Sequence, residues 1–319
     1  MGTRGRPRPD ARRRRRRSSR EADPGVALIA IADAAPLARL TTIGTGGPAR
    51  AFARPSTLAE LEQALGWAHQ RELVVATIGL GSNMLAADEG VDALVLRLGG
   101  ELAAVASDGE TLRAGGGATN GVCLHHARAA GLGGLEFACA IPGTAGGGVW
   151  MNAGAYGSDC SAILIRALVV TAVGSGWLSP AELGLSYRHS TLEHGQVVAE
   201  VEYRLMTRPP AEIKADVADL IARRKATQPT NKRTFGSVFK NPEHELGAGQ
   251  MLEACGLKGH RIGGAVISPM HANFIENTGG ATTADALALM GEARRRARER
   301  FGVELEHEVE LLGPIEPPS

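Results

Sequence analysis

Apolar residues in the N-terminal third of the chain alternate between helix-like and strand-like spacing. The segment behind Ser56 and Thr57, two candidate N-caps, carries leucines close to the helical period. Short apolar runs at 74–80 and 91–98 predict buried strands, the first of which contains a glycine near its end. We therefore expect a small α/β lobe over residues 26–98.

A second region, residues 99–207, has shorter periodic segments and much more glycine. The pattern at 111–131 predicts a strand, a glycine turn and a helix, and the runs at 163–172 and 196–206 are typical of strands. Residues 134–159 are rich in glycine and alanine and predict a long run of turns. This combination predicts an α+β lobe with glycine loops on its ligand face.

The C-terminal third returns to long amphipathic segments after an Arg-Pro-Pro sequence at 208–210, which is a linker signal. We expect a third domain over residues 211–315. Its predicted elements are helices at 212–228, 248–257 and 283–302 and strands at 271–277 and 303–313.

Charge and cysteine content narrow the class of protein. Ten of the 35 basic residues are arginines within residues 1–24, so the small net charge of +1 hides a basic tail on a slightly acidic body. The tail lacks apolar periodicity, and we expect residues 1–25 to be disordered. A dispensable extension and a nucleic-acid-binding arm both remain open for it, although nucleic acid is the less favoured partner. Four scattered cysteines fit reduced thiols in a cytoplasmic protein, and no apolar run is long enough to cross a membrane.

Three separated glycine loops are the first sign of a nucleotide site. They lie at 78–85, 114–120 and 141–157, and backbone without side chains can approach a flat or diphosphate ligand closely. Together they suit an extended dinucleotide held between two domains. The candidate contacts are Gly79, Gly81, Ser82, Asn83, Pro142, Gly143, Thr144, Gly146, Gly147 and Asn152.

Six segments in a fixed order resemble the UDP-N-acetylenolpyruvoylglucosamine reductase family. The resemblance covers about Leu37 to Gly313, and the chain looks like the shorter class of that family, because no tyrosine-bearing insertion fits between Arg188 and Ser237. The segments are IGLGSNML, LEFACAIPGTAGGGVWMNAGAYG, YRHS, GSVFKNP, GGAVISPMHANFIENTG and FGVELEHEVELLG.

The resemblance implies an α+β fold with a two-lobed FAD-binding region of the vanillyl-alcohol-oxidase type and a C-terminal α/β substrate domain. It also implies bound FAD, NADPH as co-substrate, and reduction of the enolpyruvyl ether of UDP-N-acetylglucosamine in peptidoglycan precursor synthesis. Such chemistry needs a cation at the substrate carboxylate, a group that assists the charge shift, and a proton donor.

Three residues match the catalytic positions of the family. Arg188, Ser237 and Glu308 correspond to the arginine, the serine general acid and the glutamate. Outside this resemblance, each would be an ordinary surface or strand residue. Alternation along a strand places Glu306 and Glu310 on the same face as Glu308, so the pattern alone does not separate the three carboxylates.

Weaker candidates surround these three. Tyr187, Lys240, Asn241 and Asn273 are candidate substrate contacts, and a cation beside Ser237 suits either the serine or a diphosphate. No metal is expected, because neighbouring histidines at 125–126 have no spaced set of partner ligands.

Two other functions are compatible with parts of the pattern. A flavin oxidase or dehydrogenase of the same fold would not need the Arg188, Ser237 and Glu308 set. A nucleotide-binding regulatory protein with a basic arm would need no flavin at all. An absorption band of bound flavin and turnover with NADPH distinguish the three.

Overall fold

A four-stranded sheet forms the first part of the computed structural model, which describes residues 1–2 and 29–316. The predicted disordered tail therefore lies almost wholly outside the described residues. Strands β2, β5 and β3 run parallel, and β1 pairs with β2 in the antiparallel sense. The elements are β1 (Ile31–Pro36), β2 (Pro48–Ala53), α1 (Leu58–His69), β3 (Val74–Thr77) and β5 (Val91–Leu96).

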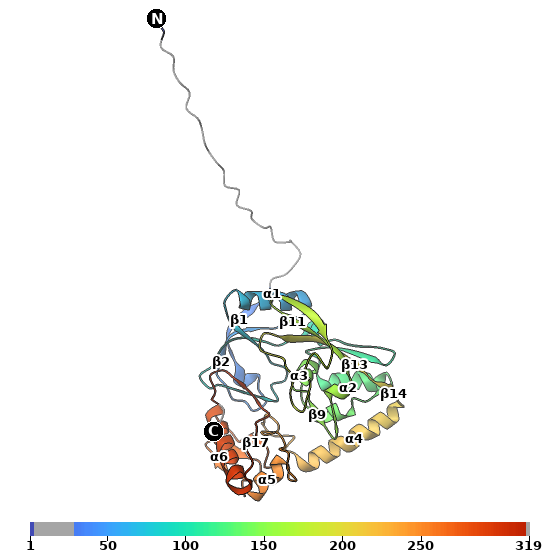
Figure 1. The fold of residues 1–319 in the computed structure, drawn as a ribbon, viewed down its shortest axis with the longest axis vertical. Helices are drawn as coiled ribbons and strands as arrows, with labels where there is room; N and C mark the ends of the chain where they lie inside the picture. The colour runs from blue at the N-terminus through green and yellow to red at the C-terminus, as the bar shows by residue number, and fades with distance from the viewer. Residues whose placement is uncertain (3–28, 317–319) are drawn as a thin grey trace.

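Helix α1 covers one face of this sheet, as its leucine spacing predicts. Thr57 is its N-cap and accepts a hydrogen bond from the backbone N–H of Glu60. Leu61 and Leu65 are fully buried against the sheet residues Leu94 and Leu96. The predicted first lobe is thus a sheet with one covering helix (Figure 1).

An antiparallel sheet forms the second part, in the order β12-β11-β13-β7-β6. Two helices accompany it, and two small ribbons complete it. The larger elements are β6 (Val105–Asp108), β7 (Thr111–Gly115), α2 (Asn120–Ala129), α3 (Ala145–Trp150), β11 (Leu164–Thr171), β12 (Gly174–Leu178) and β13 (Val197–Arg204). The ribbons pair β8 (Leu132–Gly133) with β14 (Met206–Thr207) and β9 (Gly154–Ala155) with β10 (Ser158–Asp159).

The prediction that residues 134–159 are nearly all turns is wrong. The segment contains the 3-10 helix η3 (Glu136–Ala140) and the short helix α3. Thr144 caps α3 by accepting a hydrogen bond from the N–H of Gly147 at 3.3 Å. Because glycine disfavours a helix interior, its density hid a helix that tertiary contacts stabilise.

The last part joins two long helices to a small sheet (Figure 1). Helix α4 begins at Pro210, inside the predicted linker, and packs against η3 and α2 of the second part. The elements are α4 (Pro210–Thr227), α5 (Ala248–Ala254), β15 (Arg261–Ile262), β16 (Ala265–Ile267), β17 (Ile275–Asn277) and α6 (Thr283–Phe301).

The end of the chain returns to the first part. Strand β18 (Glu310–Leu312) pairs in parallel with β4 (Met84–Ala86), directly after the first glycine loop. The predicted final strand over 303–313 is therefore much shorter, and 303–309 is irregular except for an isolated bridge from His307 to Phe239. This return brings a C-terminal segment to the edge of the first glycine loop.

Candidate active site

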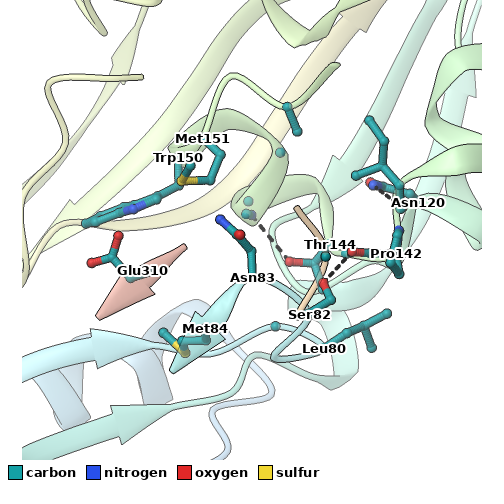
Figure 2. Close-up of a pocket in the computed structure, with 18 of the residues that line it drawn as sticks. Leu80, Ser82, Asn83, Met84, Asn120, Pro142, Thr144, Trp150, Met151 and Glu310 are labelled. Atoms are coloured by element: carbon teal, nitrogen blue, oxygen red, sulfur yellow. Dashed lines mark hydrogen bonds between the residues drawn. The ribbon is translucent and has the colours of Figure 1, made fainter. Parts of the chain in front are cut away.

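A cavity of about 410 Å³ lies where the three parts of the chain meet. Its size is in the range of small-molecule and cofactor sites. Its lining comes mainly from the first glycine loop, from residues between 140 and 156, and from 235–237. Arg188, Arg224 and Glu308 are among the single residues that complete it. Figure 2 shows the end of the cavity built by Ser82, Pro142 and Thr144, with Trp150 and Glu310 at the opposite side of the view.

Hydrogen bonds hold the first and second glycine loops against the third. The hydroxyl of Ser82 donates to the carbonyl of Pro142 (Figure 2), and the amide of Asn120 donates to the carbonyl of Ile141 at 3.0 Å. The loops are therefore fixed in position around a preformed cavity.

Many of the glycines serve contacts between loops. A Cβ on Gly79 would lie 2.7 Å from the Thr144 hydroxyl, and one on Gly146 would lie 2.9 Å from the carbonyl of Gly116. Gly143 and Gly147 have more room, with nearest neighbours at 3.6 and 3.4 Å. The high glycine content of the loops, which the sequence suggested a ligand requires, is therefore explained in part by close packing of the loops against each other.

Arg188 and Glu308 form an ion pair inside this cavity. The Nε of Arg188 donates to Oε1 of Glu308 at 3.0 Å, and its Nη2 donates to the carbonyl of Gly154 at 2.6 Å. Both side chains are less than 20% exposed. Arg188 has a φ of +52°, a left-handed conformation that is uncommon outside glycine and fixes the direction of its side chain.

Burial and neighbouring cations act in opposite directions on the pKa of Glu308. Burial raises the pKa of this carboxyl above its ordinary value, while Arg188 and Lys240 act in the opposite direction. The carbonyl of Glu308 accepts a hydrogen bond from the side chain of Asn83 at 3.1 Å, and its N–H donates to the carbonyl of Val238. Glu308 is thus held between the first loop and the serine segment.

Ser237 lines the same cavity, as the family resemblance implied. It forms an isolated bridge with Phe274, and the next residue, Val238, accepts the hydrogen bond from Glu308. Three segments, around residues 188, 237 and 308, therefore bring the guanidinium, the hydroxyl and the carboxylate to one cavity.

The three candidate glutamates occupy different environments. Glu306 is 70% exposed and pairs with Lys240 at 2.5 Å, whereas Glu310 lines the cavity 3.6 Å from Nε2 of His194. The expectation that all three share one strand face is wrong, because the chain around them is irregular until β18 begins.

The candidate substrate contacts lie around the cavity without lining it. The Asn241 side chain accepts a hydrogen bond from the N–H of Ala248 at the start of α5. The backbone N–H of Asn241 donates to the Tyr187 hydroxyl at 3.4 Å. Tyr187 is 51% exposed, and the Arg188 guanidinium stacks over its ring. Lys240 is held by Glu306.

Two candidate asparagines are buried structural groups. Asn273 exchanges both amide hydrogen bonds with the backbone of Phe239, at 3.0 and 2.8 Å. Asn152 is 1% exposed, and its amide group contacts the backbone of Ser186 and Ser161. Neither lines the cavity, so both position neighbouring segments.

Several cavity residues have no motif that the sequence analysis could use. Trp150 and His194 stack with ring centroids 5.8 Å apart, and Glu310 lies beside them. Arg224 and Gln228 enter the cavity from α4 and its end. The sequence could not single out Arg224, because it lies among other basic residues in an amphipathic helix. Within residues 29–316 no group of histidine, cysteine or acidic residues is arranged to hold a metal ion.

Two family models match successive regions of the chain. Residues 49–176 match an FAD binding domain, and residues 228–312 match the C-terminal domain of UDP-N-acetylenolpyruvoylglucosamine reductase. The second match begins directly after α4. The expected α+β fold, with an FAD-binding region followed by a C-terminal domain, is confirmed.

Relatives and a solved structure match nearly the whole chain. UDP-N-acetylenolpyruvoylglucosamine reductase 2 of Symbiobacterium thermophilum is 45% identical over 293 residues, which cover 91% of this chain and 94% of the relative. The Anaeromyxobacter dehalogenans reductase is 45% identical over 89% of this chain and 86% of its own. The crystal structure of the Thermus caldophilus reductase superimposes with a TM-score of 0.77 at 36% identity, over 89% of this chain and 98% of that one. The chain therefore belongs to the UDP-N-acetylenolpyruvoylglucosamine reductase family.

Proposed function

We propose that this FAD-dependent oxidoreductase reduces the enolpyruvyl ether of UDP-N-acetylglucosamine to UDP-N-acetylmuramate, with NADPH as reductant, in peptidoglycan precursor synthesis. One observation carries the proposal: Arg188, Ser237 and Glu308, from three distant segments, line one cavity in a chain of this family.

The residues around the cavity fit a flavin nucleotide. The start of α3 and the loop at 79–83 place side-chain-free backbone and the side chains of Ser82 and Thr144 beside a preformed space. We propose that these loops hold FAD through Gly79, Gly81, Ser82, Asn83, Pro142, Gly143, Thr144, Gly146 and Gly147. When bound, FAD supplies the two-electron transfer between NADPH and the substrate.

Each of the three catalytic residues has a task that its environment suits. The planar guanidinium of Arg188 would bind the substrate carboxylate and polarise it. As reduction proceeds, negative charge develops at C2 of the substrate, and the hydroxyl of Ser237 would deliver the proton there. Glu308, paired with Arg188 at 3.0 Å, would hold the guanidinium in position and respond to the change in charge.

The rim of the cavity suits the nucleotide portion of the substrate. The Tyr187 hydroxyl of the second part accepts a hydrogen bond from the backbone N–H of Asn241 in the C-terminal part. Displacement of the neighbouring Lys240–Glu306 pair would free a cation for diphosphate. We propose Tyr187, Lys240 and Asn241 as direct contacts. Asn152 and Asn273 act as positioning residues, because their amides are satisfied by backbone.

We propose the cytoplasm as the compartment, where NADPH and nucleotide-linked precursors are available. The four free cysteines support a reducing environment. In residues 29–316, each helix is too short or too polar to traverse a lipid bilayer.

Anaerobic half-reactions test the proposal. The purified protein should carry a flavin band, lose it on addition of NADPH, and recover it when the enolpyruvyl nucleotide is added in the absence of oxygen. Recovery with oxygen but not with the enolpyruvyl nucleotide would instead identify an oxidase of the same fold.

A further inference from the structure

Helix α4 delivers one arginine to the cavity from outside the three catalytic segments. The helix crosses from the second part toward the C-terminal part (Figure 1) and packs along η3. The hydroxyl of Tyr156 donates to the carbonyl of Leu220 at 3.1 Å and fixes the helix beside the cavity wall. Arg224, four residues further, lines the cavity together with Gln228 and Tyr156.

Arg224 has no ion pair in the part of the chain that the structure describes. The other charged groups of the cavity are matched: Arg188 pairs with Glu308 and His194 lies 3.6 Å from Glu310. The ionisable groups that act on Arg224 are those of Tyr156 and Cys139, both of which are neutral in their ordinary states. Burial lowers the pKa of Arg224 below its ordinary value, because the cation is partly removed from water, and Tyr156 and Cys139 oppose this shift only in part.

The neighbouring arginine on the same helix shows the contrast. Arg223 is 66% exposed and pairs with Asp219 at 2.8 Å, one turn earlier. A partly buried cation without a counter-charge costs folding free energy, and a ligand anion that paired with it would offset part of that cost. Arg224 is thus partly buried and has no counter-charge, and a ligand anion could supply one.

We propose that Arg224 binds an anionic group of a nucleotide held in this cavity, and that α4 is therefore part of the nucleotide site. The inference rests on the proposed function and deepens it by assigning a charge contact. The anionic group is a phosphate. It belongs either to FAD or to one of the two nucleotide substrates, NADPH and the enolpyruvyl nucleotide.

Charge removal at Arg224 tests the inference. The variants are Arg224→Gln, which removes the charge, and Arg224→Lys, which keeps it, with Arg223→Gln as the matched control on the solvent side of the helix. The readouts are the flavin content of the purified protein, the dissociation constant for FAD, KM for NADPH and for the enolpyruvyl nucleotide, and the thermal midpoint with and without added FAD.

The source of the anion decides which readout changes. If it belongs to FAD, Arg224→Gln should bind FAD at least tenfold more weakly and lose part of the thermal shift that FAD produces. If it belongs to a substrate, FAD binding should stay unchanged while one KM rises at least tenfold with a smaller change in kcat. In both cases Arg224→Lys should recover part of the loss, and Arg223→Gln should match the wild type.

Equal FAD affinity and equal KM values for Arg224→Gln and Arg223→Gln would overturn the inference. An unaltered midpoint for Arg224→Gln without FAD shows that the fold is intact, and Arg224→Lys provides the same comparison should the glutamine variant unfold. This result would leave the proposed function standing, since that function fails only if the wild type lacks flavin or does not oxidise NADPH.

Discussion

At the residue scale, chemistry depends on surroundings that residue identity does not reveal. Glu306, Glu308 and Glu310 lie within five residues of one another, yet one is exposed, one is paired with Arg188 and one lies beside His194. Family motifs selected Glu308 among these three carboxylates. Periodicity could not, because it assumed a regular strand where the chain is irregular.

The raised pKa of Glu308 predicts a specific pH dependence of stability. Between the ordinary carboxyl pKa and the raised value, the folded protein binds more protons than the unfolded chain, so the free energy of unfolding falls as pH rises through this window. Glu308→Gln should lose this contribution. Relative to the wild type, the variant should therefore become more stable as the pH rises from the ordinary carboxyl pKa of 4.5 through the raised pKa of Glu308.

Denaturant unfolding across this pH range measures the effect. Glu306→Gln, at a site that is 70% exposed, is the matched control for loss of a carboxylate. If the curves of Glu308→Gln and the wild type stay parallel across the whole range, burial does not perturb Glu308 as described.

At the scale of elements, the site depends on one short connection between distant segments. Asn83 donates a side-chain hydrogen bond to the carbonyl of Glu308, and its own carbonyl accepts one from the N–H of Glu310. These contacts continue the parallel pairing of β4 with β18. The first glycine loop and the carboxylate segment are thereby held as one unit.

Asn83→Ala should loosen that unit. Loss of the 3.1 Å hydrogen bond leaves a carbonyl unsatisfied, and we expect about 1–2 kcal/mol of lost stability together with weaker retention of FAD. Chemical unfolding and flavin content measure the two effects. Asn231→Ala, at an exposed turn, is the control, and identical behaviour of the two variants would contradict the role of Asn83.

Elements with strong local signals were predictable, and elements made by tertiary contact were not. The Thr57 cap and the leucine spacing of α1 suffice to place that helix. Helix α3 was missed because its glycines disfavour a helix and only Thr144 and the surrounding loops stabilise it. The boundary at 208–210 was read as a linker, whereas Pro210 opens α4, a position where its missing N–H costs nothing.

At the scale of the whole molecule, the cavity exists only because three parts of the chain meet. Lining residues come from both sheets, from α4 and from the C-terminal segment that ends in β18. The order of motifs implied this meeting through family resemblance. Local patterns could not have given it, since contacts such as that between Asn83 and Glu308 join residues 225 positions apart.

A ligand that touches all three parts should stabilise them together. At a free FAD concentration of 100 times its dissociation constant, the free energy of unfolding should rise by about 2.7 kcal/mol. Calorimetry should show the transition moving upward with FAD, and less with riboflavin, which lacks the diphosphate. A midpoint that does not respond to FAD would contradict the assignment of the cavity.

The central claim is that Ser237 delivers the proton in the half-reaction with the enolpyruvyl nucleotide and has no part in oxidation of NADPH. Anaerobic stopped-flow spectroscopy of Ser237→Ala separates the two half-reactions, with Ser179→Ala as control, because the Ser179 hydroxyl donates to Glu182 and does not line the cavity. We predict flavin reduction by NADPH at a rate close to that of the wild type, and reoxidation by the enolpyruvyl nucleotide slowed by about 10²–10⁴-fold. Reoxidation of Ser237→Ala at the wild-type rate would contradict the account.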